Sequence, residues 1–338
     1  MNKEAITQKA VSLTGIKPTG EIHIGNYFGA IVPALELAKT HQARYFIADY
    51  HALNTIKEPK MLRSYTLGVA TCWLACGLDP NAVLFYRQSD VHQTFELATM
   101  LMAFTAKGLM NRAHAYKDVV AKNIAAQKES DFGVNMGLFT YPVLMAADIL
   151  LFDADLVPVG KDQFQHIEIA ADIAGAFNHN YGVEAFKIPA PLVNRDSQIV
   201  VGLDGRKMSK SYSNTIALFQ DEKSLRKQIM RIVTNSQGVE EVKDPDVCNL
   251  FALYKLVATP EQQQQLANRY RAGGMGWGEA KEALFNCLNS KIAPMRDIYN
   301  DYMSNPQKIQ DILEMGAQKA RLLAKQKLEK LRHIIGID

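Results

Sequence analysis

The first short apolar run of the chain lies at residues 11–16, and similar runs follow at residues 44–49 and 82–86. Short apolar runs with β-branched residues are typical of strands that are buried on both faces of a sheet. Between them, from residue 24 onward and over residues 61–77, the apolar positions recur at helical spacing. This alternation of strand and helix predicts a parallel sheet with right-handed crossovers.

Helical spacing dominates the rest of the chain. It predicts three helices, over residues 94–127, 137–151 and 163–177, and we also expect a polar link at 189–196 and a strand at 198–201. The apolar face of residues 94–127 is either core or a dimer surface.

The character of the sequence changes near residue 204, after which few strand signals occur. We therefore expect an α/β domain at residues 1–203 and an all-helical domain at 204–305. The final basic amphipathic helix, within residues 306–338, is expected to pack back on the first domain, and direct contact with RNA is the alternative.

Composition narrows the class of protein. A chain of 338 residues can bury a large core, and its length favours two domains. The formal net charge of +3 does not indicate a protein that wraps nucleic acid, although local contact stays open. No apolar run has the length of a membrane span or of a signal-peptide core, so we expect a soluble, cytoplasmic protein with no membrane partner.

The four cysteines do not form a closely spaced set. Cys72 and Cys76 lie in an apolar helical run, while Cys248 and Cys287 are far apart in the sequence. Buried free thiols are the expected state of Cys72 and Cys76, and we expect no metal site built from the protein.

The loop after the first apolar run has the features of a nucleotide site. It joins the carboxyl end of a predicted strand to the start of a helix, where backbone N–H groups and the helix dipole favour phosphate. Residues 15–20 have the glycine spacing of a P-loop, but Glu21 and Ile22 stand where Lys and Ser or Thr are required. A dinucleotide G-x-G-x-x-G pattern is also absent. Gly25 would let a flat ring lie against the backbone, and His23 and Asn26 can donate hydrogen bonds; an ordinary turn is the alternative.

Asp148 is the second candidate for chemistry. It lies inside an almost wholly apolar predicted helix, where an unpaired charge would be very costly, so it needs a partner. Active-site groups of a parallel sheet gather at the carboxyl ends of the strands, which are near Gly15, Asp49 and Gln88. Asp162, at the start of the next helix, is on local grounds most simply an N-cap.

A third candidate is the segment Lys-Met-Ser-Lys-Ser at residues 207–211, which follows the glycine-containing stretch 202–205. Such a flexible basic loop can close on phosphate. A solvated charged face is the alternative.

The sequence Pro-Thr-Gly-Glu-Ile-His-Ile-Gly-Asn at residues 18–26 and the segment at 207–211, with a parallel-sheet pattern between them, resemble the two signatures of class I aminoacyl-tRNA synthetases. Two further stretches are similar to bacterial tryptophanyl members of this family: Tyr-Pro-Val-Leu-Met-Ala-Ala-Asp at 141–148, and residues 157–166. The resemblance extends from about residue 11 to the C-terminus. Leu13 stands where Phe is usual in the family and Lys17 where Gln is usual, which indicates a divergent subgroup.

The resemblance implies a Rossmann-like catalytic domain and a tryptophan–tRNA ligase. Such an enzyme activates L-tryptophan with ATP to tryptophanyl-adenylate and pyrophosphate, and then transfers tryptophan to tRNA(Trp). It also implies that Mg²⁺ arrives with ATP, that the protein is a homodimer, and that the helical domain, with the 207–211 loop at its start, binds the anticodon.

The resemblance further implies roles for individual residues. Catalytic roles fall to Lys207, Lys210, Asn26 and His23. ATP would be held by Lys17, Pro18, Thr19, Gly25, Asn26, Gly160, Lys161, Asp162, Ile199, Lys207, Met208, Ser209, Lys210 and Ser211. Tryptophan would be held by Asp148, Gly15, Leu13, His51, Tyr141, Met145, Val159 and Gln163, and Asp148 would accept the indole N–H.

Two alternatives remain at this point. A tyrosyl-tRNA synthetase shares the fold and the nucleotide loops, but the usual context of its Tyr and Asp is not found here. A synthetase-like regulatory paralogue would bind nucleotide or RNA without charging tRNA, and the intact Lys207 and Lys210 speak against it.

Overall fold

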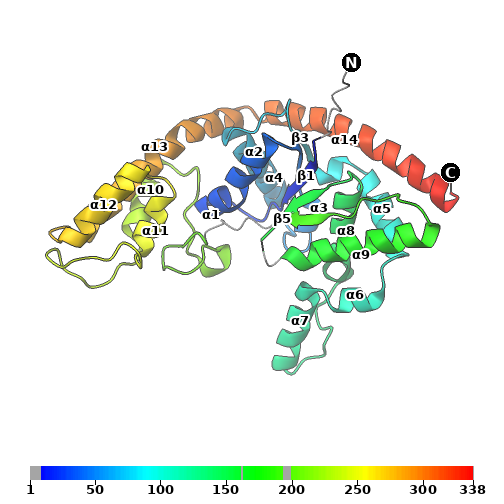
Figure 1. The fold of residues 1–338 in the computed structure, drawn as a ribbon, viewed down its shortest axis with the longest axis horizontal. Coiled ribbons are helices and arrows are strands. Elements are labelled where there is room, and N and C mark those ends of the chain that lie inside the picture. The colour runs from blue at the N-terminus through cyan, green and yellow to red at the C-terminus, as the bar shows by residue number, and fades with distance from the viewer. Residues whose placement is uncertain (1–8, 161–162, 193–198, 338) are drawn as a thin grey trace, which may run out of the picture.

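A five-stranded parallel sheet is the centre of the protein, with helices on both faces and a further group of helices to one side (Figure 1). The structure is a computed structural model that describes residues 9–160, 163–192 and 199–337. The strands are β1 (Val11–Ile16), β2 (Gln42–Ile47), β3 (Leu84–Arg87), β4 (Leu156–Pro158) and β5 (Ala190–Leu192). They lie in the order β3-β2-β1-β4-β5, so the direction of winding reverses between β1 and β4.

The helical segments follow the alternation that the sequence predicts. They are α1 (Ile24–Asn26), the π-helical turn η1 (Tyr27–Ile31), α2 (Val32–Ala38), α3 (Asp49–Ala52), α4 (Pro59–Ala75), the 3-10 turn η2 (Gln88–Asp90), α5 (Gln93–Met102), α6 (Lys107–Asn111), α7 (His114–Ala125), α8 (Met136–Leu150), α9 (Phe164–Tyr181), the 3-10 turn η4 (Lys210–Tyr212), α10 (Glu222–Met230), α11 (Asn249–Lys255), α12 (Pro260–Ala272), α13 (Trp277–Ser304) and α14 (Pro306–Ile335).

Alternate residues of the central strands enter two different cores. On β2, Tyr45 and Ile47 belong to the core that contains α2 and α4, while Phe46 belongs to the core that contains α5, α8 and α9. Successive side chains of a strand point to opposite faces, so both faces of β2 must be apolar. The short apolar runs of the sequence are explained by this double burial.

Two strands were missed by the sequence interpretation. β4 lies between the helices expected at 137–151 and 163–177, where no strand was expected, and β5 lies in the expected polar link. Each has three residues and contains a proline, Pro158 in β4 and Pro191 in β5, and so gives no apolar run. The strand expected at 198–201 was wrong for its described part, where Val201 makes only an isolated antiparallel bridge to Lys207.

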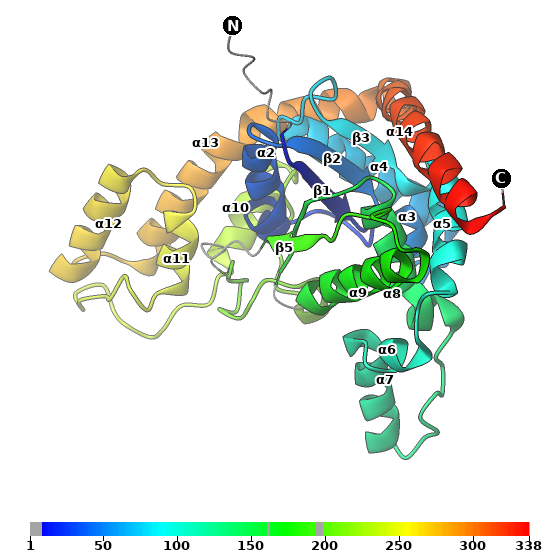
Figure 2. The ribbon, with the colours of Figure 1, turned by 45° about the vertical axis from the view of Figure 1, so that its right-hand side comes forward.

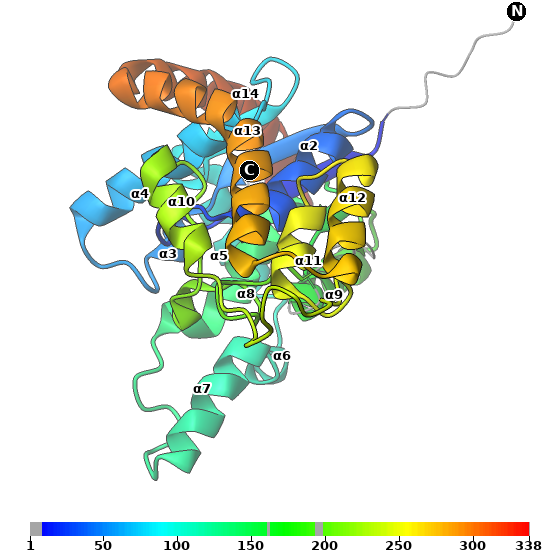
Figure 3. The same cartoon turned by 90° about the vertical axis from the view of Figure 1, so that its left-hand side faces the viewer.

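The long helix expected at residues 94–127 is divided into α5, α6 and α7. Ala106 and Ala113 take extended conformations as the N-caps of α6 and α7, so the backbone is not helical at these two points. Ala98 and Leu101 of α5 are buried, so its predicted face is core, whereas α7 buries no residue. The segment α6–α7 projects from the body of the molecule in both views (Figure 2, Figure 3).

The two long helices α13 and α14 form an arch over the molecule (Figure 1). α14 packs on α5 and on the turn after β3: Arg332 pairs with Glu96 of α5 at 2.6 Å, and Arg321 donates to the carbonyl of Asp90 at 3.1 Å. No helix in the described ranges is long and apolar enough to cross a membrane.

Candidate functional site

A pocket opens where the sheet reverses its winding, at the carboxyl ends of β1 and β4. Its volume is about 320 Å³. It is lined by Leu13, Gly15, Lys17, Phe46, Ala48, His51, Tyr141, Met145, Asp148, Ile149, Val157, Pro158, Val159, Gly160 and Gln163. Ligands of open α/β sheets bind at such a reversal point. The structure brings together here all eight residues that the resemblance implies for tryptophan, with Lys17 and Gly160 from the ATP set beside them.

Asp148 is the buried charged group of this pocket, with only 2% of its surface exposed. Gln88 Nε2 donates to both of its oxygens, at 2.9 Å to Oδ1 and 2.8 Å to Oδ2, and His51 Nε2 lies 3.0 Å from Oδ2. Burial raises the pKa of Asp148, and the hydrogen bonds from His51 and Gln88 oppose that rise because they favour the ionised form. A buried carboxylate needs partners, and here the side chains of Gln88 and His51 are those partners.

Gln88 is a residue of the site for which the sequence predicts no role. It follows β3 directly and is fully buried. The strand-end argument indicates its neighbourhood, but its contact with Asp148 joins segments 60 residues apart. No local pattern in the sequence reveals such a contact.

The walls of the pocket are apolar, with a polar pair at one end. Leu13, Met145 and Val159 line it, and the Tyr141 hydroxyl is hydrogen-bonded to His166 Nε2. A Cβ atom on Gly15 would lie 2.5 Å from Cζ of Phe46, so the Phe46 ring requires glycine at this point. Gly15 thus leaves backbone exposed to whatever fills the pocket.

The first signature loop is held by reciprocal hydrogen bonds. His23 Nδ1 accepts from the backbone N–H of Asn26 at 3.3 Å, and Asn26 Oδ1 accepts from the backbone N–H of His23 at 3.2 Å. Burial, with a smaller effect of the Lys210 charge, lowers the pKa of His23 to about 4. A neutral imidazole is what this arrangement needs, because Nδ1 must accept.

The loop at residues 207–211, called the lysine loop from here on, lies together with the residues that follow it against the first signature loop at residues 18–26. Ile24 donates its backbone N–H to the carbonyl of Ile216 at 2.9 Å, and Leu218 donates to Ile22 at 3.0 Å. A Cβ atom on Gly20 would lie 3.2 Å from Nζ of Lys210, and one on Gly25 would lie 3.3 Å from Cβ of Met208. The two signatures are therefore neighbours in space, although nearly 200 residues separate them.

The lysine loop is shaped by a tight hairpin. Gly202 donates its N–H to the carbonyl of Arg206 at 2.7 Å, and Gly205 has a φ of +82°, which strongly favours glycine. Asn214 Oδ1 accepts from the N–H of Ser209 at 2.8 Å, and Ser209 in turn caps η4. The glycines before the loop thus serve its geometry.

Three lysines of the ATP set are available to an anion. Lys17, Lys207 and Lys210 take part in no ion pair among the described residues. Partial desolvation lowers the pKa of Lys17 and of Lys210, although both residues are exposed, and Glu21 partly offsets the shift at Lys210. Phosphate oxygens near these ammonium groups would oppose the shift.

The other residues of the ATP set are more dispersed. Pro18 is buried and Thr19 half-buried in the first loop, while Ser211 is exposed in η4. Ile199 is 69% exposed. Lys161 and Asp162 lie outside the described residues. Within the described ranges, no group of three or more His, Cys, Asp or Glu side chains is arranged to hold a metal ion.

Comparison with known proteins gives one consistent result. A family model described as tRNA synthetases class I (W and Y) matches residues 5–292. The tryptophan–tRNA ligase of Neisseria meningitidis is 48% identical over 96% of this chain and 97% of its own length, and that of Bordetella pertussis is 50% identical over 96% and 72%. The crystal structure of tryptophanyl-tRNA synthetase from Campylobacter jejuni complexed with ADP and tryptophan has a TM-score of 0.90 and 45% identity, over 96% of this chain and 99% of that one.

Proposed function

The chain belongs to the class I tRNA synthetases (W and Y), and from this premise we propose how its residues divide the reaction between them. It acts as a tryptophan–tRNA ligase. It activates L-tryptophan with ATP and passes the amino acid to tRNA(Trp).

In the first step a carboxylate oxygen of tryptophan attacks the α-phosphorus of ATP. The bond from that phosphorus to the bridging oxygen breaks, and pyrophosphate leaves with the electron pair. The nucleophile is already ionised, so no general base is required. Positioning of the two substrates and stabilisation of charge on the phosphates must supply most of the rate enhancement.

Tryptophan lies in the reversal-point pocket, with its indole N–H donated to Asp148. The single observation that carries this assignment is a carboxylate that is 2% exposed at the wall of an apolar pocket. Leu13, Met145 and Val159 surround the ring. The reacting carboxylate lies toward Gly15, and Gln163 and His51 are candidates for the polar end of the substrate. A site that hydrogen-bonds a substrate N–H rejects analogues without it by roughly 10⁴-fold or more.

ATP lies across the two signature loops. Gly25 and Asn26 with Pro18 and Thr19 hold adenine and phosphate, and Gly160, Lys161, Asp162 and the backbone of Ile199 hold the nucleoside. Lys207 and Lys210, with the hydroxyls of Ser209 and Ser211, neutralise pyrophosphate as it forms. Lys17 lies between the two substrates and is suited to the α-phosphate. Mg²⁺ comes with ATP as part of the substrate, bound by phosphate oxygens and water.

The enzyme works as a homodimer in the cytoplasm, with residues 1–203 as the catalytic domain and 204–305 as the domain that binds the anticodon. The tRNA extends from one to the other. Sedimentation equilibrium tests the assembly, because a species with the mass of one chain across micromolar concentrations would contradict the dimer.

Exchange of labelled pyrophosphate into ATP tests the amino-acid assignment. We expect exchange that depends on L-tryptophan, with tyrosine less effective by at least about 10³-fold, since the phenol ring has no N–H for Asp148. Exchange with tyrosine and not with tryptophan would overturn the assignment. Formation of adenylate without any charging of tRNA(Trp) would instead favour a regulatory paralogue.

A further inference from the structure

The side-chain amide of Gln88 has a defined orientation. Its Oε1 accepts from the backbone N–H of Tyr50 at 3.2 Å, and a backbone N–H can only donate. The NH₂ group must therefore point the other way, toward Asp148, where it lies 2.9 and 2.8 Å from the two oxygens. The Gln88 amide therefore presents only hydrogen-bond donors to Asp148.

This contact decides which role Asp148 can play. A neutral carboxyl group would carry an O–H donor on one oxygen, which would leave fewer acceptor sites for Gln88 and for an incoming indole N–H. Donors from Gln88 and His51 favour the ionised form, which only accepts. Among the described contacts, Oδ2 accepts from both side chains and Oδ1 from Gln88 alone, so Oδ1 keeps acceptor capacity for a ligand.

The turn that carries Gln88 is fixed by α14 from outside the sheet. Arg87 bonds Asp90 Oδ2 at 2.7 Å and Gln310 Oε1 at 2.9 Å, and Arg321 bonds the carbonyl of Asp90 at 3.1 Å. α14 also runs very close to β3, because a Cβ atom on Gly316 would lie 1.7 Å from the carbonyl oxygen of Phe85. Figure 1 shows α14 passing over β3.

The same turn is held from the side of the pocket. Asp49, the first residue of α3, accepts the backbone N–H of Ser89 at 3.0 Å and also the Ser89 hydroxyl. Gln88 therefore sits between two neighbours, Arg87 and Ser89, that are each tied to a different helix. Its amide has little freedom to leave Asp148.

We propose that Gln88 is a positioning residue for tryptophan specificity, which holds Asp148 as a hydrogen-bond acceptor, and that α14 fixes Gln88 through the turn at residues 87–90. The proposal rests on the assignment of Asp148 to the indole N–H. It gives the C-terminal helix a part in amino-acid selection, although no residue of that helix lines the pocket.

The test compares tryptophan with its analogue in which sulfur replaces the indole N–H, 3-benzothienylalanine. Pyrophosphate exchange gives kcat/KM for each, and their ratio measures discrimination. Gln88→Met keeps the length of the side chain and removes its donors, so we expect the ratio to fall about tenfold, with KM for ATP unchanged. The matched control is Gln263→Met, whose half-buried amide donates to the carbonyls of Lys255 and Ala258 in the helical region. It should leave the ratio unchanged.

A purely structural role for Gln88 predicts another result: kcat/KM would fall equally for both amino acids and the ratio would stay constant. That result would overturn the proposal. If Gln88→Met does not fold, the milder Gln88→Asn serves, because its shorter amide cannot reach Asp148 and should also lower the ratio. An unchanged ratio in Gln88→Asn would count against the proposal in the same way.

The part assigned to α14 has its own variants. Gln310→Leu and Arg321→Met each remove one bond to the turn, and we expect the ratio to fall about threefold in the double variant. Loss of thermal stability with an unchanged ratio would remove α14 from the proposal. Failure of the assignment of Asp148 is distinguishable from all of these, because the wild-type enzyme itself would then not discriminate between the two amino acids.

Discussion

Burial raises the pKa of Asp148, and its hydrogen bonds to His51 and Gln88 only partly offset that rise. The surroundings of Asp148 as a whole therefore disfavour its ionised form, while the donors directed at the carboxylate favour it and leave an acceptor for a ligand. Residues held in such a state are common at functional sites, where local stability is lower than it need be.

Asp148→Asn separates binding of the amino acid from binding of ATP. We expect kcat/KM for tryptophan to fall by about 10²-fold, since a charge-assisted hydrogen bond is lost, while KM for ATP stays unchanged. The melting temperature should fall moderately, because the amide NH₂ of the variant would face the NH₂ group of Gln88. Pyrophosphate exchange and thermal denaturation measure the two effects. A large loss of thermal stability, with KM for ATP raised as much as KM for tryptophan, would contradict the assigned role.

The same shift predicts a dependence on pH. The pKa of Asp148 is higher in the folded state than its ordinary value of 3.8, so the folded protein holds the proton more tightly. The free energy of unfolding of the wild type, relative to Asp148→Asn, should then fall as the pH rises from 3.8 through the raised value, and be constant above it. Denaturant melts of both proteins across this range check the sign.

His23 should titrate in the opposite sense. Its pKa falls from 6.5 to about 4 on folding, so the fold favours the neutral ring. Its contribution to stability is complete above pH 6.5 and is lost as the pH falls toward about 4. The stability difference between the wild type and His23→Asn, a variant that can still cap the helix, should therefore shrink over that interval. A difference that is constant with pH would show that His23 is not held neutral.

At the scale of elements, the sequence predicts the strands that have recurring apolar runs and misses the strands of three residues. The runs that became β1, β2 and β3 are apolar because both faces of the sheet are covered, and that pattern is visible without a structure. β4 and β5 are three residues long; β4 pairs with β1, and β5 pairs in turn with β4. Propensity could not reveal them, yet β4 provides one wall of the pocket.

The first helix has room for a larger side chain at Gly29 but not at Gly25. A Cβ atom on Gly25 would lie 2.9 Å from His23 Nδ1 and 3.3 Å from Cβ of Met208, whereas one on Gly29, four residues later, meets nothing within 4 Å. Gly25→Ala should therefore push the lysine loop away and raise KM for ATP by about tenfold or more. Gly29→Ala should leave KM unchanged and stabilise the protein slightly, because alanine has the higher helix propensity. Equal effects of the two variants in pyrophosphate exchange would refute this reading of Gly25.

At the scale of the whole molecule, the residues of the site were easier to predict than the contacts between them. Motifs marked Asp148, the first loop and the lysine loop, because each carries its chemistry in consecutive residues. The pairing of Gln88 with Asp148 and the tie from α14 to the 87–90 turn join segments that are distant in the sequence. Such contacts are set by topology, which a local pattern does not contain.

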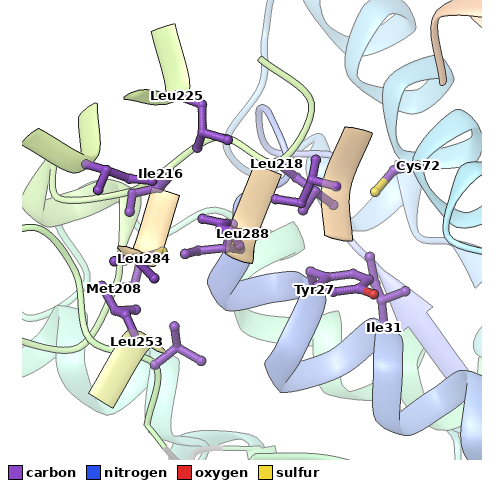
Figure 4. Close-up of a cluster of buried hydrophobic side chains, with 14 of the residues drawn as sticks. Tyr27, Ile31, Cys72, Met208, Ile216, Leu218, Leu225, Leu253, Leu284 and Leu288 are labelled. Carbon is purple, nitrogen blue, oxygen red and sulfur yellow. The ribbon is translucent and has the colours of Figure 1, made fainter. Parts of the chain in front are cut away.

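One core joins the lysine loop to the helical region. Met208 is 5% exposed, and it belongs to the same buried cluster as Leu253 of α11 and Leu284 of α13, which Figure 4 draws. On its other side it approaches Gly25 of the first loop. Movement of the helical region would therefore displace Met208 and, with it, the loops of the site proposed for ATP.

Two buried methionines can test this connection. Met208→Ala and Met275→Ala each remove a buried side chain from the same core, and each should cost about 2–5 kcal/mol of stability. Only Met208 lies against the ATP loops, so only Met208→Ala should also raise KM for ATP, by about fivefold or more. Pyrophosphate exchange at a temperature where both variants are folded separates the two effects. If both variants raise KM equally, the helical region acts on the ATP site through general stability and not through the packing of Met208.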